Sequence, residues 1–453
     1  MTMAWRQLLS RRRLSFTGEF RDNAPQPQPH RSSFERDWDR ILFSTAFRRM
    51  HDKTQVFPLP DNDVVHSRLT HSLEVASVGR SLAKNVGRVV LERHPDLAAL
   101  VDVHDFGDIV AAGCLAHDIG NPPLGHAGES AIGSYFQSAE GRAATSALSP
   151  RERDDLEHFE GNAQGFRVLT RLQLESDGGL HLTAATLAAF SKYPREAGAE
   201  LRRDGQISTK KHGFFQHDAQ TFTALARETG LVPLDPGGAA MWARHPLAFL
   251  VEAADDICYS ILDIEDGVRL DHVDAAAAET LLAALAPSID STRLDACSSR
   301  VERIGYLRAR AIGRLIDQCV EVFLDREAEM LAGTYGASLA DDMVDAAKLK
   351  ALKALAFDTC YRAPEVIEIE LAGYRALGGL LSTFVPAAVL TPPASSVIDK
   401  ARALLVGRGV NLSGGSAYER ILRVTDYVSG MTDRHALATF RRLTGITIPG
   451  RLG

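Results

Sequence analysis

The chain has 453 residues, 45% of them hydrophobic and 24% charged, which is the composition of a globular protein able to bury a large core. Its formal net charge of -7 argues against general adhesion to nucleic acid, although a local basic groove could still bind a single strand. No run of about 18 apolar residues is present, so we expect no membrane span.

Residues 1–30 differ in composition from the rest of the chain. No apolar stretch follows the arginines near the start, so a secretory signal is not expected. Residues 22–29 are rich in Pro and Gln, as extended lead-in segments are. We therefore predict a flexible segment over residues 1–30. The five widely spaced cysteines form no CxxC pair and predict reduced thiols in a cytoplasmic protein.

Apolar residues at helical spacing fill most of the remaining chain and predict an all-α fold. No Pro, Gly or Ser linker separates long blocks, so one large domain over residues 31–335, with helices of residues 336–453 packed on it, fits better than several separate domains. Strand signals are scarce, with residues 211–215 and the approach to residues 56–57 as candidates for a short hairpin or loop. The predicted helices cover residues 35–50, 66–92, 107–118, 126–138, 162–173, 180–190, 244–265, 271–286, 299–332, 340–356, 364–380, 395–406, 417–429 and 433–443.

The helix predicted over residues 66–92 carries the first candidate metal ligand, His71. Leu69, Leu73 and Ala76 recur at helical spacing and predict the stripe that faces the core, with His71 to the side of it. His71 can therefore lean toward a neighbouring helix.

The next predicted helix ends at His117 and Asp118. Residues 111–116 are apolar and small, which suits a buried helix, and the Gly-Asn-Pro-Pro sequence at residues 120–123 stops it. The His-Asp pair would then lie at the floor of a cavity. Other His-Asp dipeptides occur in polar or Gly-containing surroundings, which favour solvated pairs: His51-Asp52, His104-Asp105 and His217-Asp218.

The helix predicted over residues 244–265 carries an acidic pair, Asp255-Asp256. Asp255, Tyr259 and Asp263 are spaced four apart and project from one face. The adjoining apolar stripe faces the core and consists of Leu247, Val251, Ala254, Cys258, Ile261 and Leu262.

Two imidazoles and two carboxylates on separate segments can converge on one divalent ion. His71, His117-Asp118 and the acidic pair supply such a set. With open coordination positions it suits Mn, Fe, Mg, Co or Ni rather than a closed thiolate zinc site. A bound ion would polarise a phosphoryl oxygen and lower the pKa of a bound water.

The order His, His-Asp, Asp resembles the HD-domain metal phosphohydrolases, and longer stretches narrow the resemblance to the bacterial dGTP triphosphohydrolases. It extends from about residue 31 to residue 445 in the right order, and it is more specific for the family than for the substrate base. The stretches that carry it are residues 34–44, 46–49, 53–57, 68–74, 117–123, 125–129, 159–164, 252–259 and 424–434.

The resemblance implies an HD-type helical bundle with one divalent metal ion, for which it assigns Asp255 rather than Asp256 as the fourth ligand. It also implies that His126 and Glu129 flank the scissile bond as an acid-base pair. A loop after two prolines, with Glu129 as a helix N-terminal acid, is the alternative for that segment. The implied metal ligands are His71, His117, Asp118 and Asp255.

Substrate contacts follow from the same resemblance and from charge. A triphosphate needs bidentate cationic donors, and Arg68, one helical turn before His71, is the strongest candidate. The resemblance places Gln55 at the sugar 3′-hydroxyl and against C2′, and Tyr259 against the sugar ring. For Asp263 a structural carboxylate is the alternative. The other expected contacts are Arg48, Lys53, Asn162 and Asp263.

These expectations describe an enzyme that converts 2′-deoxynucleoside triphosphates to deoxynucleoside and tripolyphosphate. The alternatives are another HD activity, such as a nucleotidase or a cyclic or alarmone phosphodiesterase, and a nucleotide-responsive regulator without catalysis. The resemblance further implies an activating dNTP at a second site and a tetramer or hexamer. Apolar residues of the C-terminal helices are the expected subunit contacts: Leu371, Leu377, Leu380 and Phe384.

Overall fold

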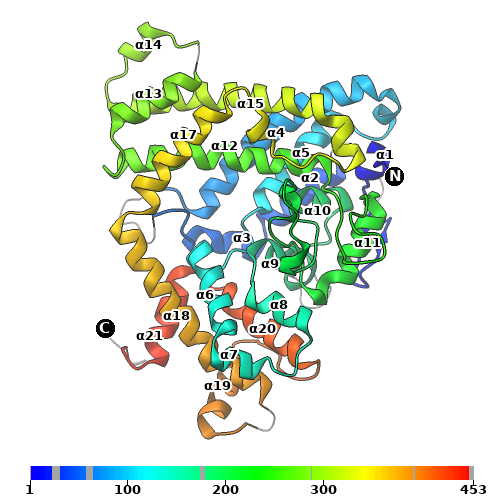
Figure 1. The fold of residues 1–453 in the computed structure, drawn as a ribbon, viewed down its shortest axis with the longest axis vertical. Helices are drawn as coiled ribbons and strands as arrows, with labels where there is room; N and C mark the ends of the chain where they lie inside the picture. The colour runs from blue at the N-terminus through cyan, green and yellow to red at the C-terminus, as the bar shows by residue number, and fades with distance from the viewer. Residues whose placement is uncertain are drawn as a thin grey trace.

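The structure is a computed structural model that describes residues 2–22, 31–57, 65–173, 179–286, 288–390 and 393–447. Helices dominate it, which confirms the all-α prediction (Figure 1). In chain order they are α1 (Trp5–Leu8), α2 (Ser33–Leu42), α3 (Thr45–Arg49), α4 (Arg68–Arg93), α5 (Val103–Ala116), α6 (Gly125–Gln137), α7 (Ala139–Ala144), α8 (Pro150–Glu157), α9 (Gly161–Arg167), α10 (Ala184–Phe190), α11 (Ala219–Thr229), α12 (Pro246–Arg269), α13 (Ala275–Leu285), α14 (Ser291–Asp295), α15 (Arg300–Ala332), α16 (Leu339–Asp342), α17 (Ala346–Ala356), α18 (Pro364–Val389), α19 (Ser396–Gly407), α20 (Ala417–Ser429) and α21 (Asp433–Leu443).

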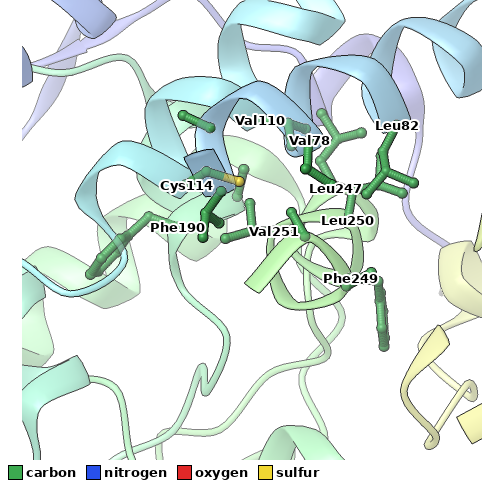
Figure 2. Close-up of a cluster of buried hydrophobic side chains, with 14 of the residues drawn as sticks. Val78, Leu82, Val110, Cys114, Phe190, Leu247, Phe249, Leu250 and Val251 are labelled. Carbon is green, nitrogen blue, oxygen red and sulfur yellow. The ribbon is translucent and has the colours of Figure 1, made fainter. Parts of the chain in front are cut away.

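The larger hydrophobic core lies where α4, α5 and α12 meet, with α10 and α15 packed around them. A Cβ on Gly79 of α4 would lie only 2.5 Å from Cys114 Sγ of α5, so the glycine lets the two helices approach closely. The predicted core stripe of α12 is buried as expected. Figure 2 shows the side chains that interlock here: Val78, Leu82, Val110, Cys114, Phe190, Leu247, Phe249, Leu250 and Val251.

A second core joins the middle of the chain to its C-terminal part. The long helix α18 runs from the level of α17 down one side of the molecule, where it packs against α6, α20 and α21 (Figure 1). Leu377, Leu380 and Phe384 are fully buried in this core, so they cannot contact another subunit. Leu371, by contrast, is 62% exposed. The expectation that all four residues form subunit contacts is therefore wrong for three of them, and only Leu371 remains a candidate contact.

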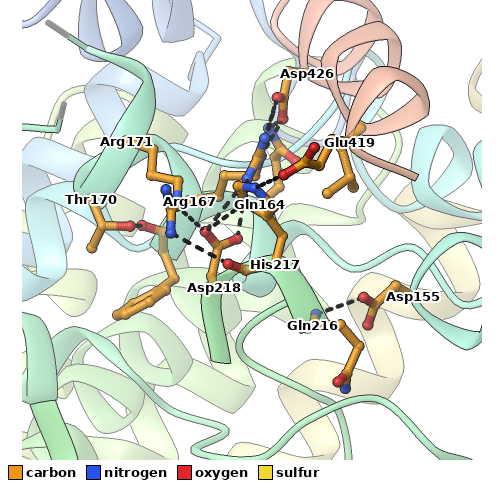
Figure 3. A network of polar contacts seen from close by, with 12 residues as sticks. Asp155, Gln164, Arg167, Thr170, Arg171, Gln216, His217, Asp218, Glu419 and Asp426 are labelled. Atoms are coloured by element: carbon orange, nitrogen blue, oxygen red, sulfur yellow. Dashed lines mark hydrogen bonds and ion pairs between the residues drawn. The ribbon is translucent and has the colours of Figure 1, made fainter. Parts of the chain in front are cut away.

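A polar network ties the same C-terminal part to the middle of the chain (Figure 3). Arg167 of α9 pairs with Asp426 of α20 at 2.8 Å and with Asp218, the last residue of the 3-10 turn η6 (Gln216–Asp218), at 3.4 Å. Asp218 is fully buried and also bonds Arg171. The expectation of a solvated His217-Asp218 pair is therefore wrong, because the carboxylate compensates two guanidinium groups.

The N-terminal segment is folded over residues 2–22, contrary to the flexible segment predicted for residues 1–30. Strands β1 (Arg13–Leu14) and β2 (Phe20–Arg21) pair antiparallel. Trp5 is buried and donates to Glu327 Oε1 at 2.7 Å, and buried Arg13 donates to buried Asp37 at 2.6 Å. Burial of apolar side chains and a compensated charge hold the segment in place. The Pro- and Gln-rich residues 23–30 lie outside the described residues.

The two segments predicted as a short hairpin or loop are loops. Phe214 and Phe215 are fully buried, and residues 211–215 run as irregular chain between helices. Residues 56–57, the last described before residue 65, form a bend. In the part of the chain that the structure describes, no helix has both the length and the apolar character needed to cross a lipid bilayer.

Candidate metal centre

Helix α4 presents His71 to the interior. Ser67 caps the helix, with a capping box to Thr70, and so fixes its start at Arg68. His71 is 1% exposed, whereas Leu73, predicted to face the core, is 38% exposed. The buried face of α4 thus includes polar residues, and the predicted stripe is rotated relative to the real one.

Helix α5 ends at Ala116, and His117 is its C-cap residue. His117 Nδ1 lies 2.7 Å from the Cys114 carbonyl oxygen. A proton on Nδ1 donated to this carbonyl leaves Nε2 with a free lone pair, as a metal-binding histidine requires. Asp118 follows in the turn and accepts hydrogen bonds from Asn121 Nδ2 at 2.6 Å and from Arg68.

The candidate ligand atoms of α4, the end of α5 and α12 converge. Asp255 Oδ1 lies 3.3 Å from His71 Nε2 and 3.4 Å from His117 Nε2. His117 Nε2 lies 3.5 Å from Asp118 Oδ2. Ligand atoms about 2.0–2.2 Å from one ion are roughly 3–3.6 Å apart, so these separations fit a shared divalent ion. One ligand atom from each of His71, His117 and Asp118 forms a group within 4.8 Å.

Asp255, rather than Asp256, faces the two imidazoles. Asp256 Oδ1 instead pairs with Lys353 Nζ at 2.8 Å. Burial opposes ionisation of Asp255, but Lys192 and His117 hold its pKa well below its ordinary value. Likewise, burial opposes ionisation of Asp118, and Arg68 and His117 keep its pKa low. Both carboxylates are therefore charged and suited to bind a cation.

Two lysines that the sequence analysis missed lie beside this cluster. Lys192, two residues after α10, pairs with Asp255 Oδ2 at 2.8 Å. Lys211 pairs with Glu160 at 2.7 Å and lies 3.7 Å from Glu129 Oε2. Both lie in irregular segments without helical periodicity, so no local pattern could have identified them. Arg68 and Lys192 therefore pair directly with the candidate ligands Asp118 and Asp255, whereas Lys211 pairs with Glu160.

His126 and Glu129 lie in the first turns of α6, so the loop alternative for this segment is wrong. His126 is exposed to solvent. Loss of hydration, together with the charges of Lys211 and Arg68, lowers the pKa of His126, so the neutral imidazole dominates at pH 7. Glu129 is buried and accepts from the Gly161 amide at 2.7 Å. Among the described contacts none joins His126 to Glu129.

The start of α6 is built closely around Arg68. Gly125 has φ of +58°, and a Cβ there would lie 2.4 Å from Arg68 Nη2. Only glycine satisfies both the left-handed backbone and this contact. The guanidinium that bonds Asp118 therefore also touches the turn that leads into His126.

The expected sugar contacts, Gln55 and Tyr259, are both half-buried. Gln55 Oε1 is buried, and no residue described by the structure donates a hydrogen bond to it. Tyr259 stacks on Tyr361 with ring centroids 5.6 Å apart, and Tyr361 donates to Asp263. Burial raises the pKa of Asp263 to about 8. Asp263 is thus a buried, hydrogen-bonded carboxyl group on the same helix face as Asp255.

Other expected substrate contacts are placed differently. Lys53 is buried, its amine donates to the carbonyl oxygens of Asn121 and Ser429, and burial lowers its pKa to about 7. Two of its three N–H donors are thus engaged by the backbone, and a contact of Lys53 with substrate stays a prediction. Arg48 is exposed on α3, with no side-chain contact to the cluster among the described residues. Asn162 donates to Glu160, next to Lys211.

Comparison with known proteins agrees with this arrangement. The HD domain model matches residues 68–160, which include three of the four candidate ligands, and the phosphohydrolase-associated domain model matches residues 339–442. A deoxyguanosinetriphosphate triphosphohydrolase-like protein of Synechocystis sp. is 44% identical over 98% of this chain and all of the relative. One of Pseudomonas aeruginosa is 40% identical over 99% of this chain and all of the relative. A Serratia proteamaculans protein named deoxyguanosinetriphosphate triphosphohydrolase is 32% identical over 90% of this chain and 93% of its own length.

Proposed function

Because the chain belongs to the deoxyguanosinetriphosphate triphosphohydrolase-like family of HD-domain hydrolases, we propose that it hydrolyses 2′-deoxynucleoside triphosphates, dGTP among them, to the 2′-deoxynucleoside and tripolyphosphate. The proposal rests above all on the convergence of His71, His117, Asp118 and Asp255, with cationic side chains beside them. The metal-dependent phosphohydrolase class follows from the HD domain. The choice of substrate is the further step proposed here.

His71, His117, Asp118 and Asp255 would hold one divalent ion, which supplies Lewis-acid polarisation of a phosphoryl oxygen and a lowered pKa for bound water. Arg68 and Lys192, which pair with candidate ligands, and Lys211, whose charge acts on His126, would bind and orient the polyphosphate. Water would attack the α-phosphorus, and the bond to the 5′-oxygen would break. His126 would accept the water proton or deliver a proton to the leaving 5′-oxygen.

Product identity tests the proposal. The enzyme, freed of metal and then supplied with Mn²⁺ or Mg²⁺, is incubated with each dNTP alone and in pairs, and products are separated by anion exchange. Tripolyphosphate and deoxynucleoside, without dNDP or dNMP, are expected. Formation of dNMP or dNDP would point to another HD activity, and no turnover with any metal would point to a regulator. Stimulation by a second dNTP would reveal the activating nucleotide that we also propose.

We further expect discrimination against ribonucleotides by a crowded C2′ position, with Gln55 and Tyr259 as its wall. A site that merely lacks a partner for the 2′-hydroxyl rejects it only about a hundredfold, so a stronger bias requires steric exclusion. The measurement is kcat/KM for dGTP over GTP in the wild type, Gln55→Ala and Tyr259→Ala, with Tyr306→Ala as a control on the distant helix α15. Both wall variants should lower the ratio. Equal hydrolysis of GTP by the wild type would contradict the deoxynucleotide assignment.

We also propose that the chain forms a homo-oligomer, a tetramer or hexamer. Ile367, Leu371 and Tyr374 are spaced four and three residues apart on α18 and are 42%, 62% and 41% exposed, which leaves an apolar stripe open to a second copy. Light scattering should give several times the subunit mass, and Leu371→Glu should reduce it. A strictly monomeric, active wild type would refute this expectation.

A further inference from the structure

The turn that leads into α6 has a strained backbone. Leu124, two residues before His126, adopts φ of 63° and ψ of 22°, the left-handed conformation that residues with a Cβ rarely adopt. Such outliers persist only where the surroundings enforce them, and they cluster at functional sites. What holds Leu124 therefore also sets the position of His126.

Two C-terminal helices hold this residue. Asp433, the first residue of α21, accepts the Leu124 amide proton on Oδ1 at 2.9 Å. The Leu124 side chain lies against Gly373 of α18, where an added Cβ would come within 2.4 Å of Leu124 Cδ1. The C-terminal part thus fixes both the backbone and the side chain of the strained residue.

The second oxygen of Asp433 holds a different segment. Oδ2 accepts from the Thr54 amide at 2.8 Å and from Thr54 Oγ1 at 2.6 Å. Thr54 immediately precedes Gln55, the proposed sugar contact. Asp433 is 1% exposed, so solvent cannot replace these three bonds. One buried carboxylate therefore spans the turn before His126 and the turn before Gln55.

A second link runs parallel to the first. Lys53 Nζ donates to the carbonyl oxygens of Ser429, at the end of α20, and of Asn121, which also bonds the candidate ligand Asp118. The stretch from Ser429 to Asp433 therefore contacts the turn before Gln55 at two points and the turn before His126 at one, and Lys53 links the two turns directly.

We infer that Asp433 is a positioning residue, which sets the distance between the proton-transfer group His126 and the sugar-binding group Gln55. The inference rests on the proposed function. A displacement of about 1 Å of a group that acts in the reaction can reduce the rate about a hundredfold. Residues 339–442, outside the HD domain, would then be required for a correctly assembled site.

Asp433→Asn tests the inference, because the amide keeps the size of the side chain but can accept on one side only. We expect kcat for dGTP to fall about 10- to 100-fold, the dGTP/GTP ratio of kcat/KM to fall, and the metal content to stay unchanged. Thr54→Val removes only the Oγ1 bond and should give the same pattern with a smaller loss, which keeps the test valid if the first variant folds poorly.

Glu327→Gln is the matched control. Glu327 is also a buried carboxylate with several donors, Trp5, Arg93 and His94, but it anchors the N-terminal segment to α15. It should lower Tm without changing the dGTP/GTP ratio. If Asp433→Asn and Thr54→Val affect only Tm, as this control does, the positioning role is wrong.

A phosphodiester substrate that contains no nucleoside distinguishes a failure of this inference from a failure of the proposed function. If the wild type cleaves bis(p-nitrophenyl) phosphate but no dNTP, the proposed substrate class fails, while kcat for this ester still reports the placement of His126. An Asp433→Asn variant with wild-type kcat for both the ester and dGTP would overturn the inference.

Discussion

Replacement of His117 or Asp118 by alanine should abolish both metal binding and turnover while the helical fold remains. His117 Nε2 and Asp118 Oδ2 are adjacent donor atoms of the cluster, 3.5 Å apart, and the remaining residues leave an incomplete coordination set. Asp118→Ala also leaves the buried Arg68 without its carboxylate, so its Tm should fall more than that of His117→Ala. Elemental analysis of metal per subunit, circular dichroism and dNTP turnover are the measurements.

His104→Ala is the control for this experiment. His104 belongs to another His-Asp dipeptide but is exposed at the start of α5, so metal content and turnover should be unchanged. The double variant His117→Ala/Asp118→Ala decides the assignment. Full metal occupancy in that double variant would show that the ion binds elsewhere.

Helical periodicity located most helices of this chain within a few residues, because long amphipathic segments carry their pattern locally. The stripe of α12, from Leu247 to Leu262, is buried as predicted, and Asp255 projects from the adjoining face toward His71 and His117. Where hydrophobicity alone decides which face is buried, the sequence therefore suffices.

The prediction failed on α4 because the site buries polar groups. Periodicity assigns the core face to Leu69, Leu73 and Ala76. Ala76 is buried, but Leu73 is exposed, and the buried face instead includes Arg68 and His71. The interior position of Arg68 is stabilised by Asp118, fifty residues away, and such a long-range pair leaves no trace in local spacing. The polar face of a helix at a catalytic centre is thus the face that an apolar pattern misassigns.

Contacts between segments far apart in sequence explain the other failures. Lys192 and Lys211 reach the cluster from irregular segments, and their partners Asp255 and Glu160 lie on other elements. The ion pair between Arg13 and Asp37 holds the N-terminal segment in place, and composition does not reveal such a pair. The resemblance to a family supplied residue roles that spacing could not. The proximity in sequence that suggested Lys53 as a substrate contact did not reveal that its amine bonds two backbone carbonyls.

Replacement of His126 by alanine should keep metal and dNTP affinity but lower kcat by about two to four orders of magnitude, the usual contribution of a positioned acid or base. His126 is absent from the converging ligand atoms, so its loss leaves the metal centre complete. An interaction made only in the transition state affects kcat rather than substrate binding. Steady-state kinetics, metal analysis and equilibrium binding of a non-hydrolysable dNTP analogue separate these effects.

The pH profile distinguishes a proton-transfer role from a structural one. Loss of hydration, Lys211 and Arg68 lower the pKa of His126, so the imidazole is neutral at pH 7 and gains its proton only below the ordinary range of histidine. If the neutral form accepts the proton of water, wild-type kcat should fall as the pH drops through this lowered pKa, and His126→Ala should lack that limb. Ser130→Ala, one turn further along α6 and exposed, should retain both the rate and the limb. Normal turnover by His126→Ala would show that the start of α6 has a structural role alone. Glu129, which accepts a hydrogen bond from the Gly161 amide, would then also be a structural residue.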